Sequence, residues 1–247
     1  MDRLIYTAMT GAKQIMEQQA TVSQNLANTN TVGFKGQIDM FRAVPVRGPG
    51  LLTRVQVIDE TVGADLSVGK ILQTDRSLDL AIEGSGWFAV KTADGKEAYT
   101  RAGDLKVGAN GVLQTHSGLT VLSEESAPIL ISSDSSIMVG KDGTLSYLVA
   151  GDNPVTTNFL GRIKLVNPSP KELVRGDDAL FHSLTGDSFS SDPTITLQSG
   201  ALEESNINVV ESMVAMISLG RQYDLQMDML KNAKDDANKS SQIMSLT

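Results

Sequence analysis

The stretch VVESMVAMISLGRQYDLQMDMLKNAKDDANKSSQIM, residues 209–244, places mostly apolar or small side chains at steps of three and four residues. This heptad spacing is typical of a helix that packs along a seam. Asn206 or Asn208 can cap the helix, and Glu211 follows Asn208 by three residues, as in a capping box. The spacing predicts a helix over residues 208–244 with the seam Val209, Met213, Met216, Gly220, Tyr223, Met227, Leu230, Lys234, Ala237, Ser241 and Met244.

The N-terminal end of the chain repeats this pattern. It predicts a helix over residues 4–27, which ends where the turn-forming run of residues 28–33 begins. Because two alanines and a glutamine in the seam bury little apolar area, this helix needs packing partners. We expect the two terminal helices to pack as a coiled coil, with the N-terminal seam at Ile5, Ala8, Ala12, Ile15, Gln19, Val22 and Leu26.

The middle of the chain is rich in strand and turn signals. Three Asn-Gly or Asp-Gly pairs lie between alternating apolar runs, a pattern typical of hairpins with type I′ turns. Three hairpins in succession predict a mainly β central domain, an antiparallel barrel or sandwich. The pairs are Asp94-Gly95, Asn110-Gly111 and Asp142-Gly143.

The changes in pattern along the chain predict its organisation. Residues 1–34 form the N-terminal helix and its turn, and residues 35–75 form an extended linker or hairpin. Residues 76–200 form the β domain, and residues 201–247 form the C-terminal helix. Both ends of the chain are therefore predicted to be helices with a packing seam, and such a chain is suited to assembly more than to catalysis.

Composition excludes several classes of function. The net charge is -8 and no Lys/Arg cluster is present, which argues against nucleic-acid binding. No apolar run is long enough to span a membrane, and the start lacks the features of a Sec signal peptide. With no cysteine in 247 residues, disulfides and thiolate metal sites are excluded.

The sequence carries no pattern of catalytic residues. The two histidines, His116 and His182, are far apart and outside any metal-ligand spacing. Nucleophile-elbow, Walker and zinc-protease motifs are also missing. We therefore predict a protein that is not an enzyme, with no catalytic residue, no metal site and no cofactor.

Three segments together resemble the bacterial flagellar rod and hook proteins. Residues 23–35 (SQNLANTNTVGFK) are similar to the N-terminal signature of that family. Residues 78–88 (LDLAIEGSGWF) and 99–103 (YTRAG) resemble the start of its β domain, and residues 198–207 (QSGALEESNI) resemble its C-terminal motif. The opening residues 1–12 and residues 42–46 look most like the proximal rod members, with the distal rod members as the alternative.

The resemblance implies a structural subunit of the flagellar rod, the drive shaft that crosses the periplasm. It implies export through the flagellar type III apparatus, with other rod proteins and copies of itself as partners. The helices would pack in an inner tube that transmits torque. The interface residues expected on this basis are Ile5, Ala8, Ala12, Ile15, Val22, Asn25, Leu26, Asn28, Gly33, Phe34, Val209, Met213, Met216, Tyr223, Met227 and Leu230.

Two other classes of function compete with this interpretation. A secreted adhesin with a helical stalk is suggested by the tripeptide Arg175-Gly176-Asp177, although the heptads are short for a stalk and a signal peptide is missing. An exported cell-wall hydrolase would need a carboxylate pair and sugar-stacking aromatic residues. One tryptophan and four tyrosines make that class less favoured.

Overall fold

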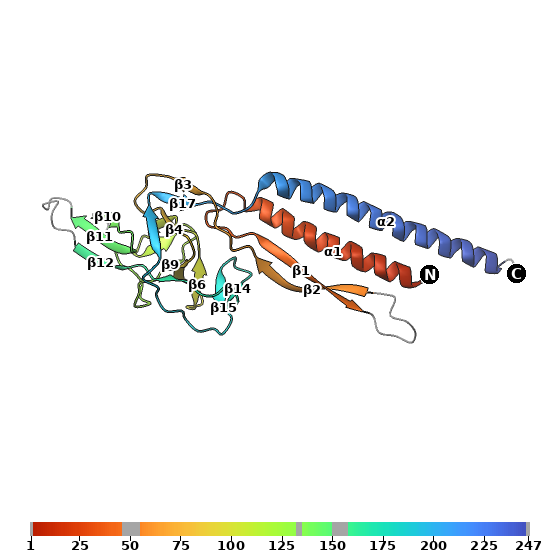
Figure 1. Ribbon diagram of the computed structural model, residues 1–247, viewed down its shortest axis with the longest axis horizontal. Coiled ribbons are helices and arrows are strands. Elements are labelled where there is room, and N and C mark those ends of the chain that lie inside the picture. The colour runs from red at the N-terminus through yellow and green to blue at the C-terminus, as the bar shows by residue number, and fades with distance from the viewer. Residues whose placement is uncertain (1, 46–54, 132–134, 150–157, 246–247) are drawn as a thin grey trace. The chain divides into compact units, whose positions relative to one another are not determined.

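The computed structural model describes residues 2–45, 55–131, 135–149 and 158–245 (Figure 1). The chain divides into two compact units. Unit 1 comprises residues 1–28, 37–64 and 207–247, and unit 2 comprises residues 29–36 and 65–206. Each unit is therefore assembled from segments that are distant in sequence.

Unit 1 consists of two long helices and one hairpin. Helix α1 (Asp2–Ala27) lies between helix α2 (Val209–Ser245) and the antiparallel hairpin of β1 (Gln37–Pro45) and β2 (Val55–Ala64) (Figure 1). The side chain of Asn208 caps α2 by accepting hydrogen bonds from the backbone N–H groups of Val210 and Glu211, at 3.1 and 3.4 Å. The predicted helices at both ends are confirmed. Neither helix, within its described residues, is long and apolar enough to cross a membrane.

Unit 2 is built from short antiparallel strands. Its largest sheet has the order β14-β15-β6-β5-β9-β8-β7, and β13 also pairs with β5. The bounds are β5 (Trp87–Lys91), β6 (Glu97–Thr100), β7 (Leu105–Val107), β8 (Leu113–Thr115), β9 (Thr120–Val121), β13 (Leu165–Val166), β14 (Leu173–Arg175) and β15 (Phe181–Ser183). Because β14 and β7 stand at the two ends of this order, the described residues form an open sheet and not the closed barrel that was one of our expectations.

Smaller sheets complete unit 2. A three-stranded sheet joins β10 (Ser135–Val139), β11 (Thr144–Val149) and β12 (Asn158–Arg162). Two further pairs bring the last strands of the unit back to its first: β16 (Thr196–Ser199) pairs with β4 (Leu80–Glu83), and β17 (Ala201–Glu203) pairs with β3 (Ile71–Gln73). The described residues of unit 2 form an apolar core among these sheets, which includes Leu80, Phe88 and Leu197. The prediction of a mainly β centre is confirmed.

The three predicted hairpins are present, but their turns differ from the expectation. Strands β5–β6, β7–β8 and β10–β11 pair across the Asp-Gly and Asn-Gly dipeptides. Only the glycine of each pair has a positive φ, for example 80° at Gly95, whereas a type I′ turn needs two such residues. In the first hairpin Thr92 N–H donates to the Lys96 carbonyl and Gly95 N–H donates to the Thr92 carbonyl. Each connection is thus a three-residue loop with glycine in the left-handed position.

Candidate assembly site

The three sequence motifs meet in unit 2 at one buried carboxylate. Glu203, the last residue of β17, lies with Oε1 2.6 Å from Nζ of Lys35 and with Oε2 2.9 Å from Nη1 of Arg101. Lys35 ends the N-terminal motif, Arg101 follows β6, and Glu203 belongs to the C-terminal motif. All three side chains are at most 3% exposed. We call these three residues the charge cluster.

Further hydrogen bonds satisfy most of the polar side-chain atoms of the charge cluster. Lys35 Nζ also donates to the carbonyl of Ser67 at 2.6 Å, and Arg101 Nη2 donates to the carbonyl of Gly84 at 2.6 Å. Glu203 Oε1 accepts the backbone N–H of Gly69 at 2.8 Å. Burial lowers the pKa of the Lys35 ammonium, and the hydrogen bond and charge of Glu203 oppose that shift. The ion pairs therefore offset part of the cost of burying charge in this place.

Backbone contacts join the same segments of unit 2. Gly33 N–H donates to the carbonyl of Glu203 at 2.7 Å, and Gly36 N–H donates to Oδ1 of Asn206 at 2.8 Å. The amide of Asn206 in turn donates to the carbonyl of Asp65 at 2.8 Å. Residues 33–36, 65–69 and 203–206 are thereby tied into one hydrogen-bonded junction.

Two of the expected interface residues, Gly33 and Phe34, lie inside this junction. Gly33 has a φ of 65°, and a Cβ at that position would lie 2.3 Å from the carbonyl carbon of Arg101. Phe34 is buried, and the Arg175 guanidinium carbon lies 4.7 Å from the centre of its ring. Arg175 also donates a hydrogen bond to the carbonyl of Lys35. The arginine of the Arg-Gly-Asp tripeptide is thus engaged within unit 2, which weakens the adhesin interpretation.

Asn25 and Asn28 have local roles. The side chain of Asn25 accepts the backbone N–H of Gln37 and donates to the Gln37 carbonyl, both at 2.8 Å. One turn earlier on α1, the Thr21 hydroxyl donates to Oδ1 of Asp39 at 2.8 Å. Asn28 donates from its side chain to the carbonyl of Gln24 at 2.9 Å, near the end of α1. The first two contacts fix α1 against β1 within unit 1.

The seam of α1 lies where the spacing places it. Ala8, Ala12 and Ile15 are buried, and Ile5, Val22 and Leu26 are half-buried.

The buried face of α2 differs from its expected seam. Met216, Tyr223 and Leu230 are half-buried as members of that seam, but Val209, Met213 and Met227 are exposed. The most buried positions of α2 are instead Leu219 and Ala233. The physical reason is close approach at Gly11 of α1, where the Gln226 carboxamide lies 3.4 Å from the site of an added Cβ. Among the described side chains of α2, the buried or half-buried positions are 212, 215, 216, 219, 220, 223, 226, 230 and 233, which share Met216, Gly220, Tyr223 and Leu230 with the expected set.

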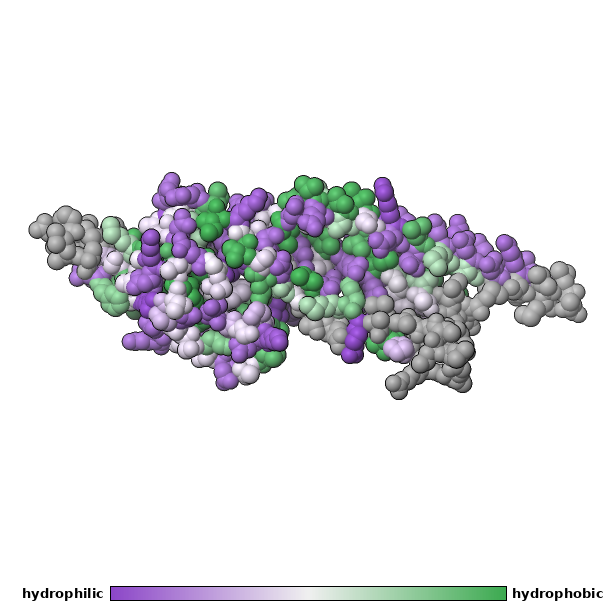
Figure 2. All heavy atoms as spheres, in the orientation of Figure 1, coloured by the Kyte–Doolittle hydropathy of each residue, from purple (hydrophilic) through white to green (hydrophobic). Residues whose placement is uncertain are grey.

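This arrangement leaves a second apolar face on α2, which lies outside the expected seam. Val210, Val214 and Ile217 are 70%, 61% and 59% exposed and follow each other at helical spacing. Figure 2 shows hydrophobic residues gathered over the first turns of α2. We call Val210, Val214 and Ile217 the α2 stripe. The nearly continuous apolar run of residues 209–217 indicates this second face in the sequence, because such a run is apolar on more than one side of a helix.

Helix α1 also carries exposed apolar side chains. Tyr6, Met9 and Met16 of this helix are all exposed, whereas Ala8, Ala12 and Ile15 are buried. Both helices of unit 1 thus carry apolar side chains beyond those that their mutual packing covers.

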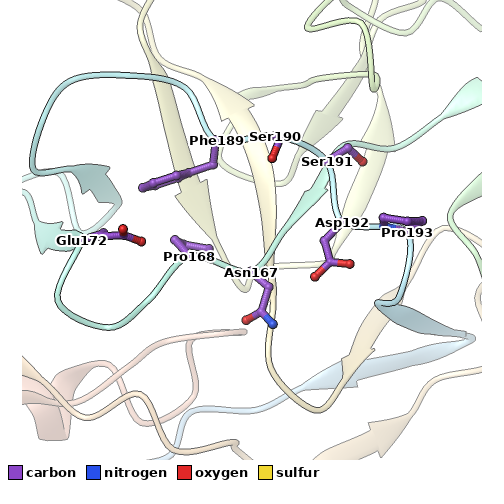
Figure 3. Close-up of a pocket in the computed structure, with 8 residues that line it drawn as sticks. All are labelled: Asn167, Pro168, Glu172, Phe189, Ser190, Ser191, Asp192 and Pro193. Atoms are coloured by element: carbon purple, nitrogen blue, oxygen red, sulfur yellow. The ribbon is translucent and has the colours of Figure 1, made fainter.

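A pocket of about 310 Å³ lies in unit 2, lined by Asn167, Pro168, Glu172, Phe189, Ser190, Ser191, Asp192 and Pro193 (Figure 3). Its carboxylates are engaged by their own loops. Glu172 accepts the backbone N–H of Ser169 at 3.0 Å, and Asp192 accepts two hydrogen bonds from Thr194. The latter bonds lower the pKa of Asp192, which disfavours its protonation and therefore a role as a general acid. Within the described parts of the chain, His, Asp and Glu form no group of three that could hold a metal ion.

Three stretches of the chain match known protein families. Residues 5–35 match the family described as Flagella basal body rod protein, and residues 81–147 match the Flagellar hook protein FlgE/F/G D1 domain. Residues 198–243 match the Flagellar basal body rod FlgEFG protein C-terminal family. Each matched stretch contributes one residue of the charge cluster.

Full-length relatives agree with these matches. The flagellar basal-body rod protein FlgF of Escherichia coli K12 is 42% identical over 253 residues, and the alignment covers all of both chains. FlgF of Salmonella typhimurium is 41% identical, again over all of both chains. The rod protein FlgG of Bacillus subtilis is 30% identical, over 90% of this chain and 92% of that protein.

Proposed function

The chain belongs to the family of flagellar basal-body rod proteins, and we propose that it joins its neighbours in the rod through the apolar faces that its two helices leave open. It is a structural rod subunit of the FlgF kind. Its relatives are structural rod proteins and not enzymes.

The exposure of the α2 stripe is the observation that carries this proposal. Three adjacent β-branched side chains on one face, each more than half exposed, are costly to leave in water. Burying a valine or isoleucine side chain contributes about 1.5–3 kcal/mol, so a neighbouring helix over the stripe would add several kcal/mol per contact. Contiguous exposed apolar patches of this kind mark interaction surfaces.

The same reasoning covers three exposed residues of the expected interface on α2 and three further exposed residues on α1. Val209, Met213 and Met227 are the exposed members of the α2 seam, and Tyr6, Met9 and Met16 are exposed on α1. We infer that helices of neighbouring subunits pack on these faces in coiled-coil fashion. Copies of one chain that repeat a contact which does not close a ring build a helical tube. Torque would then pass through many packed side chains, and no single residue would be catalytic.

The remaining elements of the proposal rest on family membership. The partners are other rod proteins and further copies of this chain, the place is the rod within the periplasm, and the route is the flagellar type III export apparatus.

The test is a charged substitution in the α2 stripe. We expect Ile217→Glu to leave the purified chain folded, because the side chain is exposed, but to abolish swimming in a strain that otherwise lacks this protein. Gln222→Glu adds the same charge at an exposed polar position of the same helix and should restore swimming. Secreted amounts of both variants should match the parent chain. Normal swimming of the Ile217→Glu strain would refute the proposed interface.

A further inference from the structure

The chain passes between the two units at four points. On the unit 2 side, each of these points leads into a segment that belongs to the junction. The chain crosses between the units after residues 28, 36, 64 and 206. On the unit 2 side, these crossings lead to residues 29–36, to residues from Asp65 onward, and to residues up to Asn206. Hydrogen bonds join Gly36, Asp65 and Asn206 directly, and Gly33 bonds to Glu203.

Glu203 is the centre of these contacts. Its carboxylate is the shared partner of Lys35 and Arg101, its Oε1 also accepts the Gly69 N–H, and its carbonyl accepts the Gly33 N–H. One anion therefore holds two buried cations from two different segments. Loss of one cation would leave an ion pair, whereas loss of Glu203 would leave both cations buried without it.

We propose that Glu203 is a positioning residue for rod assembly, which clamps residues 29–36 onto the β sheets of unit 2. The clamp determines where the chain leaves unit 2 toward α1 and β1. Without the carboxylate, Lys35 regains water by releasing its segment, while the apolar core of unit 2 stays packed. The link to assembly rests on the proposed function, but the clamp itself is a property of the single chain.

The chain offers a matched control for a general loss of stability. Glu97 and Lys164 form a second largely buried ion pair in unit 2, with Nζ 2.8 Å from Oε1, and neither residue takes part in the junction. Glu97→Gln therefore removes a comparable buried charge from the same unit without touching the clamp.

The experiment measures distances inside unit 2 of the purified full-length chain. Because the protein has no cysteine, two cysteines introduced at the exposed positions Asn30 and Lys96 would be the only attachment sites for spin labels. The parent chain and Glu97→Gln should give one narrow distance distribution by double electron–electron resonance. Glu203→Gln should lose that narrow peak, while the near-ultraviolet circular dichroism of the core remains.

Each other result overturns the proposal. A narrow peak retained in Glu203→Gln, a broad distribution already in the parent, or equal broadening in Glu97→Gln would show that Glu203 does not act as the clamp. If Glu203→Gln does not fold, Lys35→Met takes its place, because Lys35 is the residue through which the Glu203 carboxylate holds residues 29–36. A narrow peak in that variant would then be decisive against the clamp. These measurements need no rod, so their failure would leave the stripe proposal intact.

Discussion

Asn25 and Gln37 exchange two hydrogen bonds of 2.8 Å each, so that a side chain on α1 pairs with both backbone groups at the start of β1. The amide group of asparagine can present one N–H donor and one oxygen acceptor side by side, as the backbone of a neighbouring strand does. Together with the Thr21–Asp39 contact, it makes α1 and the hairpin one structure within unit 1.

Substitution of Asn25 should therefore loosen the hairpin before the helix. Asn25→Asp keeps the acceptor for the Gln37 N–H but loses the donor, and we expect a cost of about 1–3 kcal/mol for the unpaired carbonyl. Hydrogen exchange should show faster exchange in β1 than in the parent chain. Ser23→Ala, an exposed change on the same helix, serves as the control. Unchanged protection of β1 in Asn25→Asp would contradict the pairing role.

The charge cluster predicts an order among three substitutions. Glu203→Gln should destabilise unit 2 by about 3–5 kcal/mol, because it leaves two buried cations unpaired. Lys35→Met and Arg101→Met should each cost less, since the remaining cation still pairs with Glu203. Urea unfolding can be followed by fluorescence of Trp87, the single tryptophan, which is buried in β5. The interpretation fails if Lys35→Met costs as much as Glu203→Gln.

How far the sequence predicts this fold depends on the range of the contacts involved. The helices and hairpins follow from local spacing, and Asn208, Gly95, Gly111 and Gly143 act close to where the pattern places them. The Lys35–Glu203 pair joins residues 168 positions apart, and the local sequence of β17 gives no sign that its glutamate is buried. A single sequence cannot reveal such a pair.

The α2 face shows a different limit. Heptad spacing predicts how often side chains return to one face of a helix. It does not predict which face packs inward when residues 209–217 are apolar on several sides. The face of α2 that packs inward depends on α1, whose Gly11 allows close contact with Gln226.

Gly33 should tolerate no side chain, for two separable reasons. Its positive φ costs an alanine about 1–2 kcal/mol, and the added Cβ would meet the Arg101 backbone at 2.3 Å. Gly118 has a φ of 90° with no atom within 4 Å of an added Cβ, so Gly118→Ala isolates the backbone cost. We expect Gly33→Ala to lower the urea midpoint clearly more than Gly118→Ala. Equal effects would mean that the close contact relaxes without cost.

Asp104 predicts a pH dependence. Burial raises the pKa of its carboxyl above the ordinary value of 3.8, and nearby Asp79 adds to the shift while His116 and Arg76 oppose it. A raised pKa in the folded state means that the favourable contribution is present below pH 3.8 and is lost as the pH rises through the folded-state pKa. Asp104→Asn should therefore stabilise the protein at neutral pH, and this gain should disappear in acid. A variant that is less stable than the parent at neutral pH would rule out burial as the dominant effect.

The two units should differ in resistance to proteolysis. Unit 2 contains the buried apolar cluster, whereas the buried apolar residues among the described side chains of unit 1 are few, namely Ala8, Ala12, Ile15, Leu219 and Ala233. Low burial gives low local stability, so the helices of the free chain should open more often than the β sheets. Limited digestion followed by mass spectrometry should cut both ends first and leave fragments within residues 65–206. In assembled rods the same helices should resist cleavage, because neighbours cover the α2 stripe. If α2 of the free, monomeric chain survives as long as strands β5 and β6, the helices are stable without partners, and the stripe would have to be explained in another way.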